Sequence, residues 1–279
     1  MKVLQKDEHM AAESVLLKHL PKSFQVYGYL HACNRNKQTN IQIVVDTWPD
    51  FKVIICRPDP ENKQASDWRK KVTFYCLDEK MLRKMLLEED AIDWIILCNF
   101  IAGFDNSHTG LLKEVSTQIQ VSHTHLICAY QLYLPNSSHL VTPAFNSDIN
   151  SRISSLDLSH AHLVNQTWKF GGDELGYKKI VRQISNFPSY CITDHQGQPV
   201  SWLLLHENLS LGMLYTLPEH RRKGYATVLV YTMAQRLLAE GYPVFTYVEE
   251  GNMVSFKMFK NLGFIDDPSV RRIWFKFAT

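Results

Sequence analysis

The sequence lacks a long hydrophobic run, a strong excess of one charge and any closely spaced pair of cysteines. Its most apolar stretch, Trp94-Ile-Ile-Leu-Cys98, has the length of a strand and could not cross a bilayer, so no membrane span is expected. The formal net charge is +2, which does not indicate a nucleic-acid surface. The first arginine is Arg35, and acidic residues precede it, so the N-terminus resembles neither a secretory signal nor a typical transit peptide.

The cysteines stand singly, and most lie in or beside apolar segments, where a reduced thiol behaves as a small hydrophobic group. This pattern favours a reducing, cytoplasm-like compartment. No cluster with metal-ligand spacing is present, because His160 and His162 are two apart at a predicted helix start. His123 and His125 share a strand face but have no further ligand at a suitable spacing. No metal is therefore expected. The six cysteines are Cys33, Cys56, Cys76, Cys98, Cys128 and Cys191.

The 279 residues are 45% hydrophobic and 21% charged, which is ordinary for a soluble chain of two globular domains. Pro, Ser and Asn crowd residues 134–155, where few apolar positions are periodic, so this stretch predicts a linker. We expect domains at 1–140 and 156–279, with the linker at 141–155. In the first half the pattern predicts helices at 11–20 and 80–87, and strands at 26–32, 41–45, 51–56, 72–76, 94–100 and within 121–134.

The second half predicts a mixed α/β order of helix, helix, three strands, helix, strand, helix and strand. Ser159 is the expected N-cap of its first helix, which carries Leu163, Val164 and Trp168. The remaining elements are expected at 174–186, 189–193, 200–206, 209–216, 225–240, 244–248, 252–260 and 273–277.

The run from Leu214 to Ala226, Leu-Tyr-Thr-Leu-Pro-Glu-His-Arg-Arg-Lys-Gly-Tyr-Ala, has the features of an anion site. A strand ends, a basic turn follows, and a helix begins just after Gly224. Peptide N–H groups at a helix N-terminus bind phosphate, and the basic side chains of Arg221, Arg222 and Lys223 add full charge. Gly224 allows a positive φ, and the small residues at 224 and 226 let a diphosphate approach the backbone.

Two spaced motifs carry a family resemblance. Arg221-x-x-Gly224-x-Ala226 resembles the acyl-CoA pyrophosphate loop of the GNAT acyltransferase superfamily. The run Asn252-x-x-Ser255-x-x-x-Phe259-x-x-x-Gly263-Phe264 resembles that superfamily's second motif. A narrower similarity, to the glycine N-acyltransferase family, is carried by 158–172 with Glu174, Phe187-Pro188, 197–202, 215–221, Val26-Tyr27-Gly28 and Val45-Asp46-Thr-Trp48-Pro49-Asp50-Phe51.

The resemblance implies tandem GNAT-like mixed-sheet domains, the N-terminal one degenerate and the C-terminal one catalytic. The first domain would shape the acceptor and acyl pockets. It implies acyl transfer from acyl-CoA, as co-substrate, to the amino group of glycine or another small amino acid. It also implies a monomeric enzyme in the mitochondrion. The implied CoA contacts are Leu214, Tyr215 and Thr216 through their backbone, then Arg221, Arg222, Lys223, Gly224, Tyr225 and Ala226 at the phosphates, with Asn252, Ser255 and Phe259 from the second motif.

The chain departs from the family pattern at two positions. Active relatives carry a glutamate base six residues before the threonine of Thr-Leu-Pro-Glu, where this chain has Ser210. The alternative general bases are Glu207 and His206. An unperturbed histidine has a pKa near 6.5, which suits this role, but we slightly prefer Glu207. Many superfamily members have a tyrosine general acid where Phe259 stands. These departures keep open a second hypothesis, a non-catalytic or weakly active acyl-CoA-binding or regulatory member.

Overall fold

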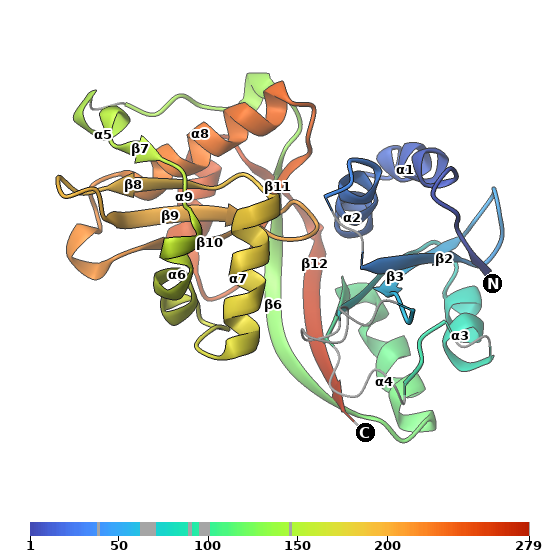
Figure 1. The fold of residues 1–279 in the computed structure, drawn as a ribbon. Coiled ribbons are helices and arrows are strands. Elements are labelled where there is room, and N and C mark those ends of the chain that lie inside the picture. The colour runs from blue at the N-terminus through green and yellow to red at the C-terminus, as the bar shows by residue number, and fades with distance from the viewer. Residues whose placement is uncertain (38–39, 62–70, 89–90, 95–100, 145–146, 279) are drawn as a thin grey trace. The chain divides into compact units, whose positions relative to one another are not determined.

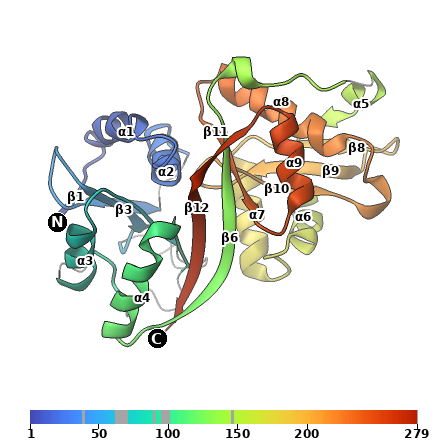
Figure 2. The same ribbon diagram turned by 180° about the vertical axis from the view of Figure 1, so that it is seen from behind.

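The computed structural model describes all residues except 38–39, 62–70, 89–90, 95–100, 145–146 and 279 (Figures 1 and 2). The chain divides into two compact units. Unit 1 comprises Met1–Tyr130 and Asp267–Thr279, and unit 2 comprises Gln131–Asp266. Both combine strands with helices, which confirms the expected mixed α/β class.

Unit 1 has strands in the order β1-β2-β3-β4-β5-β12, antiparallel except for the parallel pair β4 and β5. The long strand β6 (Ser122–Leu134) runs out of this unit into unit 2. The other elements of unit 1 are β1 (Lys2–Val3), α1 (His9–Leu17), α2 (Phe24–Asn34), β2 (Ile41–Val45), β3 (Val53–Pro58), β4 (Lys71–Cys76), α3 (Glu79–Glu88), β5 (Ile101–Asp105), α4 (Thr109–Gln118) and β12 (Ile265–Ala278).

Alternating side chains of β2 and β3 build two cores on opposite faces of the unit 1 sheet. Val44 and Ile55 pack in the core that includes residues of α3 and α4. Ile43 and Ile54 pack with residues of α1 and α2. The period of two in a strand explains the alternation, because successive side chains point to opposite faces. Continuous apolar runs such as Val53-Ile-Ile-Cys56 therefore mark strands that are covered by helices on both sides.

The expected strand at 26–32 is wrong, because these residues lie in α2. Every residue from Phe24 to Cys33 is buried, so the helix has no solvated face and its sequence shows no helical periodicity. The expected strand at 94–100 lies mostly outside the described residues. The sequence analysis predicted neither helix α4 nor strand β5.

The C-terminal strand belongs to unit 1, although the expected division placed 156–279 in one domain. β12 pairs antiparallel with β5, from Arg272 opposite Asp105 to Lys276 opposite Ile101. Phe275 of the same strand is buried in the unit 1 core. A local pattern cannot reveal such a return, because the pairing joins residues far apart in the sequence.

Unit 2 has strands in the order β11-β10-β9-β8-β7, with β10 and β11 parallel and the others antiparallel. The helices Glu174–Asn186 and Tyr225–Ala239 begin where the sequence predicts. The elements are α5 (Ser147–Ser151), β7 (Ile153–Ser154), α6 (Ala161–Thr167), α7 (Glu174–Asn186), β8 (Tyr190–Thr193), β9 (Pro199–Leu205), β10 (Leu211–Thr216), α8 (Tyr225–Ala239), β11 (Val244–Glu249) and α9 (Met253–Asn261).

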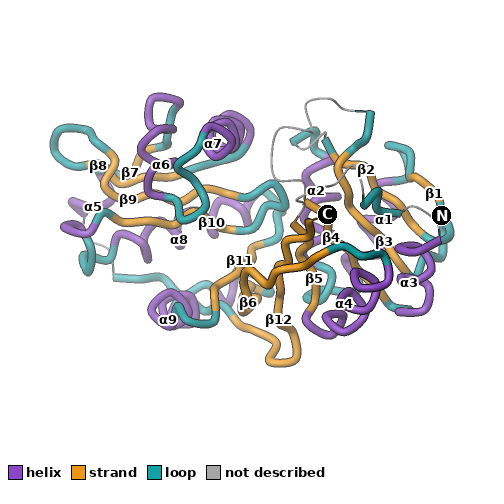
Figure 3. Tube along the Cα trace, turned by 90° about the horizontal axis from the view of Figure 1, so that it is seen from below, coloured by secondary structure: helices purple, strands orange, loops and turns teal. Residues whose placement is uncertain are grey.

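The unit 2 sheet has helices on both faces, with α6 and α7 on one and α8 and α9 on the other (Figure 3). We call the first the α6/α7 face. Its core joins Trp202, Leu204 and Met213 of the sheet to Val164 of α6 and Ile180 of α7. A 3-10 turn at Leu158–His160 precedes α6, and its cap is Asp157, two residues before the expected Ser159. The Asp157 carboxylate accepts a hydrogen bond from the Ser159 N–H at 2.8 Å.

Burial lowers the reactivity of several described cysteines, because it disfavours the thiolate form. Cys33, Cys56, Cys76, Cys128 and Cys191 are all free thiols. Desolvation raises the pKa of the Cys33 and Cys76 thiols to about 12 and that of Cys191 to about 11. These thiols therefore pack as small hydrophobic groups. Within the described ranges, no helix combines the length and apolar character needed to span a membrane.

The segment before β7 packs against the end of α9. Val141 N–H donates to the Leu262 carbonyl at 3.0 Å. Gly263 follows with φ of +94°, and a Cβ atom there would lie 1.7 Å from the His139 carbonyl oxygen. Both its backbone conformation and this close approach require glycine at the Gly-Phe end of the second motif.

We expect Gly263→Ala to lower the free energy of unfolding by roughly 3 kcal/mol, because it adds both left-handed strain and a clash with a backbone atom. Gly110→Ala is the matched control. Gly110 lies in α4, and a Cβ there meets nothing within 4 Å. That variant should change stability by less than about 1 kcal/mol. Urea unfolding of both variants tests the assignment, and equal stabilities would contradict it.

Candidate active site

Strands β10 and β11 pair at one position and then diverge. Their register holds the single pair Leu211 and Thr246, and the Thr246 hydroxyl donates to the Leu211 carbonyl at 2.9 Å. Along the rest of both strands, all of which is described, no further pairing continues towards Thr216 and Glu249. Peptide groups on this edge of β10 are thus left available to a ligand. This edge includes the stretch from Leu214 to Thr216, which was expected to bind through its backbone, although the Tyr215 and Thr216 carbonyls already accept hydrogen bonds from the Ser201 hydroxyl and Arg221 Nε.

A β-bulge interrupts β10 at the same level. Gly212 pairs with Leu204 of β9, but the next pair is Tyr215 with Trp202, so β10 contains one extra residue. Met213 takes φ of +54°, a left-handed conformation that costs a non-glycine residue of order 1–3 kcal/mol. Bulges re-aim the peptide groups next to them. Peptide N–H groups beside this bulge can therefore hydrogen-bond to a carbonyl oxygen entering between the strands.

The basic turn forms an exposed loop between β10 and α8. After a 3-10 turn at Pro218–His220, residues 221–224 are all exposed. Arg222 has φ of +62° and Gly224 has φ of +81°, which confirms the expected positive φ at this glycine. Gly224 is the N-cap of α8 and has no side chain to satisfy the first N–H groups of the helix. The helix therefore presents free donors and its positive dipole end to an anion.

The three basic side chains of the loop are not equivalent. Arg221 is held against β10, since its Nε donates to the Thr216 carbonyl at 3.1 Å and its guanidinium lies 5.6 Å from the Tyr215 ring centroid. Among the described residues, neither Arg222 nor Lys223 has an ion-pair partner. These two charges are consequently the ones best able to meet phosphate groups.

Tyr225 and Ala226 contribute to the loop in different ways. Tyr225 is buried, and its hydroxyl accepts a hydrogen bond from Arg152 Nη2 at 3.0 Å. The Arg152 guanidinium also lies 5.4 Å from the ring centroid. The Tyr225 side chain therefore anchors the first turn of α8, and its ring also stacks on the His220 ring of the basic turn, with centroids 6.5 Å apart. Ala226 is half-buried, so its small side chain keeps the helix start uncrowded.

The residues of the second motif organise α9. The Asn252 carbonyl oxygen Oδ1 accepts a hydrogen bond from the Ser255 N–H at 3.1 Å, so Asn252 is the N-cap of the helix. Phe259 is 3% exposed and meets Phe264 edge to face, with ring centroids 5.0 Å apart. Phe259 thus belongs to the core and has no proton to donate. Ser255 is half-buried, and its contact with CoA stays a prediction from the family resemblance.

The three candidate bases share the tight turn that joins β9 to β10. The His206 N–H donates to the Ser210 carbonyl at 2.9 Å, and Leu209 takes φ of +64° to close the turn. Ser210 is 1% exposed, and its hydroxyl donates to Asn208 Oδ1 at 2.8 Å. Ser210 is therefore a structural residue of the turn.

Glu207 forms a buried ion pair with Lys179 of α7. Glu207 is 8% exposed and Lys179 is 3% exposed, and the ammonium also lies 5.9 Å from the Trp168 ring centroid. The sequence reasoning missed Lys179. Its spacing carried the signal, because Gly176, Lys179, Ile180 and Gln183 are the buried residues of α7 and follow helical periodicity.

The His206 ring lies against the backbone of β10. A Cβ atom at Gly212 would be 2.1 Å from His206 Nε2, so only glycine at 212 allows this approach. Gly212 pairs with Leu204, a residue of the α6/α7 core, which places the imidazole on that face. His206 Nε2 thus sits one residue before the bulge. Of the three candidates, it is the group whose position beside β10 is most suited to proton transfer.

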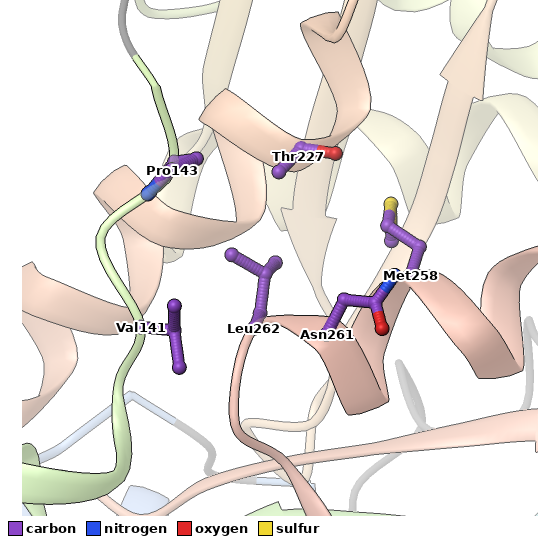
Figure 4. A pocket seen from close by; sticks show the side chains of 6 residues that line it. All are labelled: Val141, Pro143, Thr227, Met258, Asn261 and Leu262. Atoms are coloured by element: carbon purple, nitrogen blue, oxygen red, sulfur yellow. The ribbon is translucent and has the colours of Figure 1, made fainter.

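A separate pocket of about 420 Å³ lies on the opposite side of the sheet (Figure 4). Thr227 in the first turn of α8 and Met258, Asn261 and Leu262 of α9 line it, together with Val141 and Pro143. α8 and α9 lie on the sheet face opposite α6 and α7, so this pocket is not part of the α6/α7 face (Figure 3). In the described part of the chain no group of three or more His, Cys, Asp or Glu residues could hold a metal.

Comparison with known proteins identifies the family of the chain. A protein-family model described as "Aralkyl acyl-CoA:amino acid N-acyltransferase" matches residues 1–188, and one described as "FR47-like protein" matches 191–274. The glycine N-acyltransferase of Bos taurus is 29% identical over 277 residues, covering 94% of each chain. The glycine N-phenylacetyltransferase of Bos taurus is 29% identical over 282 residues, with the same coverage.

Solved structures show the same fold at lower identity. A Drosophila protein superposes with a TM-score of 0.79 at 16% identity, covering 99% of this chain and 98% of that one. A tandem GNAT protein from the clavulanic acid biosynthesis pathway has a TM-score of 0.54 at 12% identity, covering 99% and 97%. The likeness confirms the expected GNAT-type architecture.

We expect Lys179→Met to lower the free energy of unfolding by about 3–5 kcal/mol, because it leaves the Glu207 carboxylate buried without its partner. Lys178→Met, an exposed neighbour on α7, is the control and should change stability by about 0.5 kcal/mol or less. The double variant Lys179→Met with Glu207→Gln should recover at least half of the loss. Urea denaturation measures all three, and additive losses in the double variant would show that the pair is not coupled.

Proposed function

This chain belongs to the aralkyl acyl-CoA:amino acid N-acyltransferase family, and we propose that its acceptor is glycine. The family membership makes it an acyl-CoA:amino acid N-acyltransferase that forms an amide and releases CoA. The proposal of glycine is supported by the relatives named glycine N-acyltransferase and glycine N-phenylacetyltransferase. The observation that best supports an acyl-CoA site is the exposed basic loop at the N-terminus of α8. It follows β10, the strand that diverges from β11.

Acyl-CoA would bind with its diphosphate on this loop and its pantetheine arm along β10. The N-terminal N–H groups of α8 supply dipolar donors, and Arg222 and Lys223 supply charge. Arg221 would act mainly by holding the loop against Thr216. The free edge of β10 at Leu214, Tyr215 and Thr216 then offers peptide groups to the amide-containing arm.

Amide formation needs a polarised carbonyl, a neutral amine and a departing thiolate. Peptide N–H groups at the Met213 bulge would stabilise the oxyanion of the tetrahedral intermediate. The amine nitrogen bonds to the thioester carbon, and the carbon–sulfur bond breaks as the oxyanion collapses. Phe259 cannot protonate the sulfur, but a thiol with pKa near 8.5 leaves tolerably as the anion. The missing tyrosine therefore slows the reaction modestly and does not prevent it.

His206 is the general base that the geometry supports best. Its Nε2 lies beside β10 one residue before the bulge, whereas Ser210 is buried in the turn and Glu207 is paired with Lys179. The imidazole would accept the proton that the amine loses when it attacks. This choice revises the slight preference for Glu207 that the sequence suggested, because the sequence did not reveal Lys179.

We also propose a monomer in the mitochondrial compartment. Both points are supported by family resemblance alone. Expression of the chain fused to a fluorescent protein at its C-terminus tests the compartment, and light scattering of the purified protein tests the oligomeric state.

Lys223→Ala and Arg222→Ala should each raise the KM for acyl-CoA roughly threefold to tenfold at low salt, with a smaller effect at high salt, because each removes an exposed phosphate partner. Gly224→Val should act more strongly, because valine is strained at φ of +81°. Lys257→Ala, an exposed charge on α9, is the control. Unchanged CoA affinity by calorimetry in all three loop variants would show that CoA binds elsewhere.

His206→Gln should lower kcat about 100-fold and leave the KM for acyl-CoA unchanged. The parent enzyme is expected to gain activity with rising pH as the imidazole loses its proton, and the variant should lose this acidic limb. Free CoA thiol released from benzoyl-CoA with glycine, followed from pH 5.5 to 9, measures both effects. A variant that keeps the limb and the rate would exclude His206 as the base.

A further inference from the structure

The acceptor amino acid in solution is a zwitterion, so a site that selects amino acids must recognise one positive and one negative charge. The α6/α7 face offers both, in the form of an ion pair outside the machinery described above. Lys169 lies in the loop between α6 and α7, and Glu249 is the last residue of β11. Their charged atoms are 2.7 and 2.9 Å apart, from Lys169 Nζ to the two carboxylate oxygens.

The loop that carries Lys169 is firmly held. Asn165 is 5% exposed, and its Oδ1 accepts a hydrogen bond from the Gly172 N–H at 3.1 Å. A Cβ atom at Gly171 would lie 2.2 Å from the Asn165 carbonyl oxygen, so only glycine fits at this position. The Lys169 ammonium also lies 5.3 Å from the Phe170 ring centroid. The ammonium is thus presented from a fixed backbone.

Glu249 is the last residue of β11 and lies three residues beyond Thr246, the β11 residue that pairs with Leu211 of β10. Glu249 therefore belongs to the part of β11 that has diverged from β10. Its pairing with a lysine from the α6–α7 loop puts it on the α6/α7 face, where His206 also lies.

The exposure of the pair fits exchange with a ligand. The side chains of Lys169 and Glu249 are 62% and 41% exposed, and an exposed pair contributes at most about 1 kcal/mol to stability. Opening it to admit a zwitterion therefore costs little. A small amino acid would replace the single contact between Lys169 and Glu249 by two contacts, one between its ammonium and Glu249 and one between its carboxylate and Lys169.

We propose that Lys169 and Glu249 form the receptor for the amino acid acceptor, with Glu249 holding the ammonium and Lys169 the carboxylate. The bound ammonium would release its first proton to water and so become a neutral amine beside Glu249. His206 would then take the second proton, which the nitrogen loses as it bonds to the thioester carbon. This inference rests on the proposed function. It adds a carboxylate to the acceptor side of a chain that has Ser210 where active relatives carry glutamate.

Steady-state kinetics with glycine and glycinamide test the proposal, because glycinamide keeps the amine and lacks the carboxylate. Lys169→Met should raise the KM for glycine roughly tenfold or more and change the KM for glycinamide less than twofold. Glu249→Gln should raise both. The KM for benzoyl-CoA should stay within twofold of the parent value in each variant.

The control is the surface pair Arg236 and Glu240 on α8, whose side chains are 41% and 42% exposed. Arg236→Met and Glu240→Gln should leave every KM unchanged, and thermal unfolding should show all four variants folded. Equal effects of Lys169→Met on glycine and glycinamide, or no effect on either, would overturn the receptor. A rise confined to benzoyl-CoA would assign the pair to the CoA path instead.

Failure of the proposed function would look different. In that case the parent protein itself would release no CoA thiol with glycine or any other amino acid, and the receptor would fall with it. A parent protein that is active with glycine, while Lys169→Met keeps the same KM for glycine, would remove the receptor and leave the acyltransferase intact.

Discussion

One extra residue in β10 governs the geometry of the site. It lets the strand pair with β9 on one edge while its other edge leaves β11 after Leu211. A regular strand would bond to both neighbours and bury every peptide group that a thioester could use. The cost is a left-handed Met213, and β9 must hold β10 on both sides of the bulge to maintain it. Trp202 supports this, since it stacks on Tyr215 with ring centroids 5.5 Å apart.

The turn before β10 is fixed by charge and by one glycine. Lys179 ties the turn to α7 through Glu207, and Gly212 leaves room for the imidazole. The ion pair is buried, so it acts as a rigid support for the turn that carries His206. The basic loop at the other end of β10 is the opposite case. Its charges are exposed and free to meet a ligand, because phosphates arrive from solvent.

Much of unit 2 could be predicted because its signals are local. The basic turn, the positive φ at Gly224 and the helices at 174–186 and 225–240 follow from residues that are neighbours in sequence. The partner of Glu207 could not be predicted in the same way, because Lys179 lies 28 positions earlier and a lysine in a helix is usually solvated. Likewise, α2 is buried on all sides, so it carries no amphipathic signature.

The buried ion pair also decides between the two titratable groups of the turn. If Glu207 took the proton of the attacking amine, the Lys179 ammonium would be left inside the protein beside a neutral acid. Such an uncompensated charge is costly. When His206 takes the proton, Lys179 and Glu207 keep their mutual neutralisation, and the new positive charge forms on the ring next to β10. The pair therefore leaves the turn's carboxylate as a support and its histidine as the group that can change charge during the reaction.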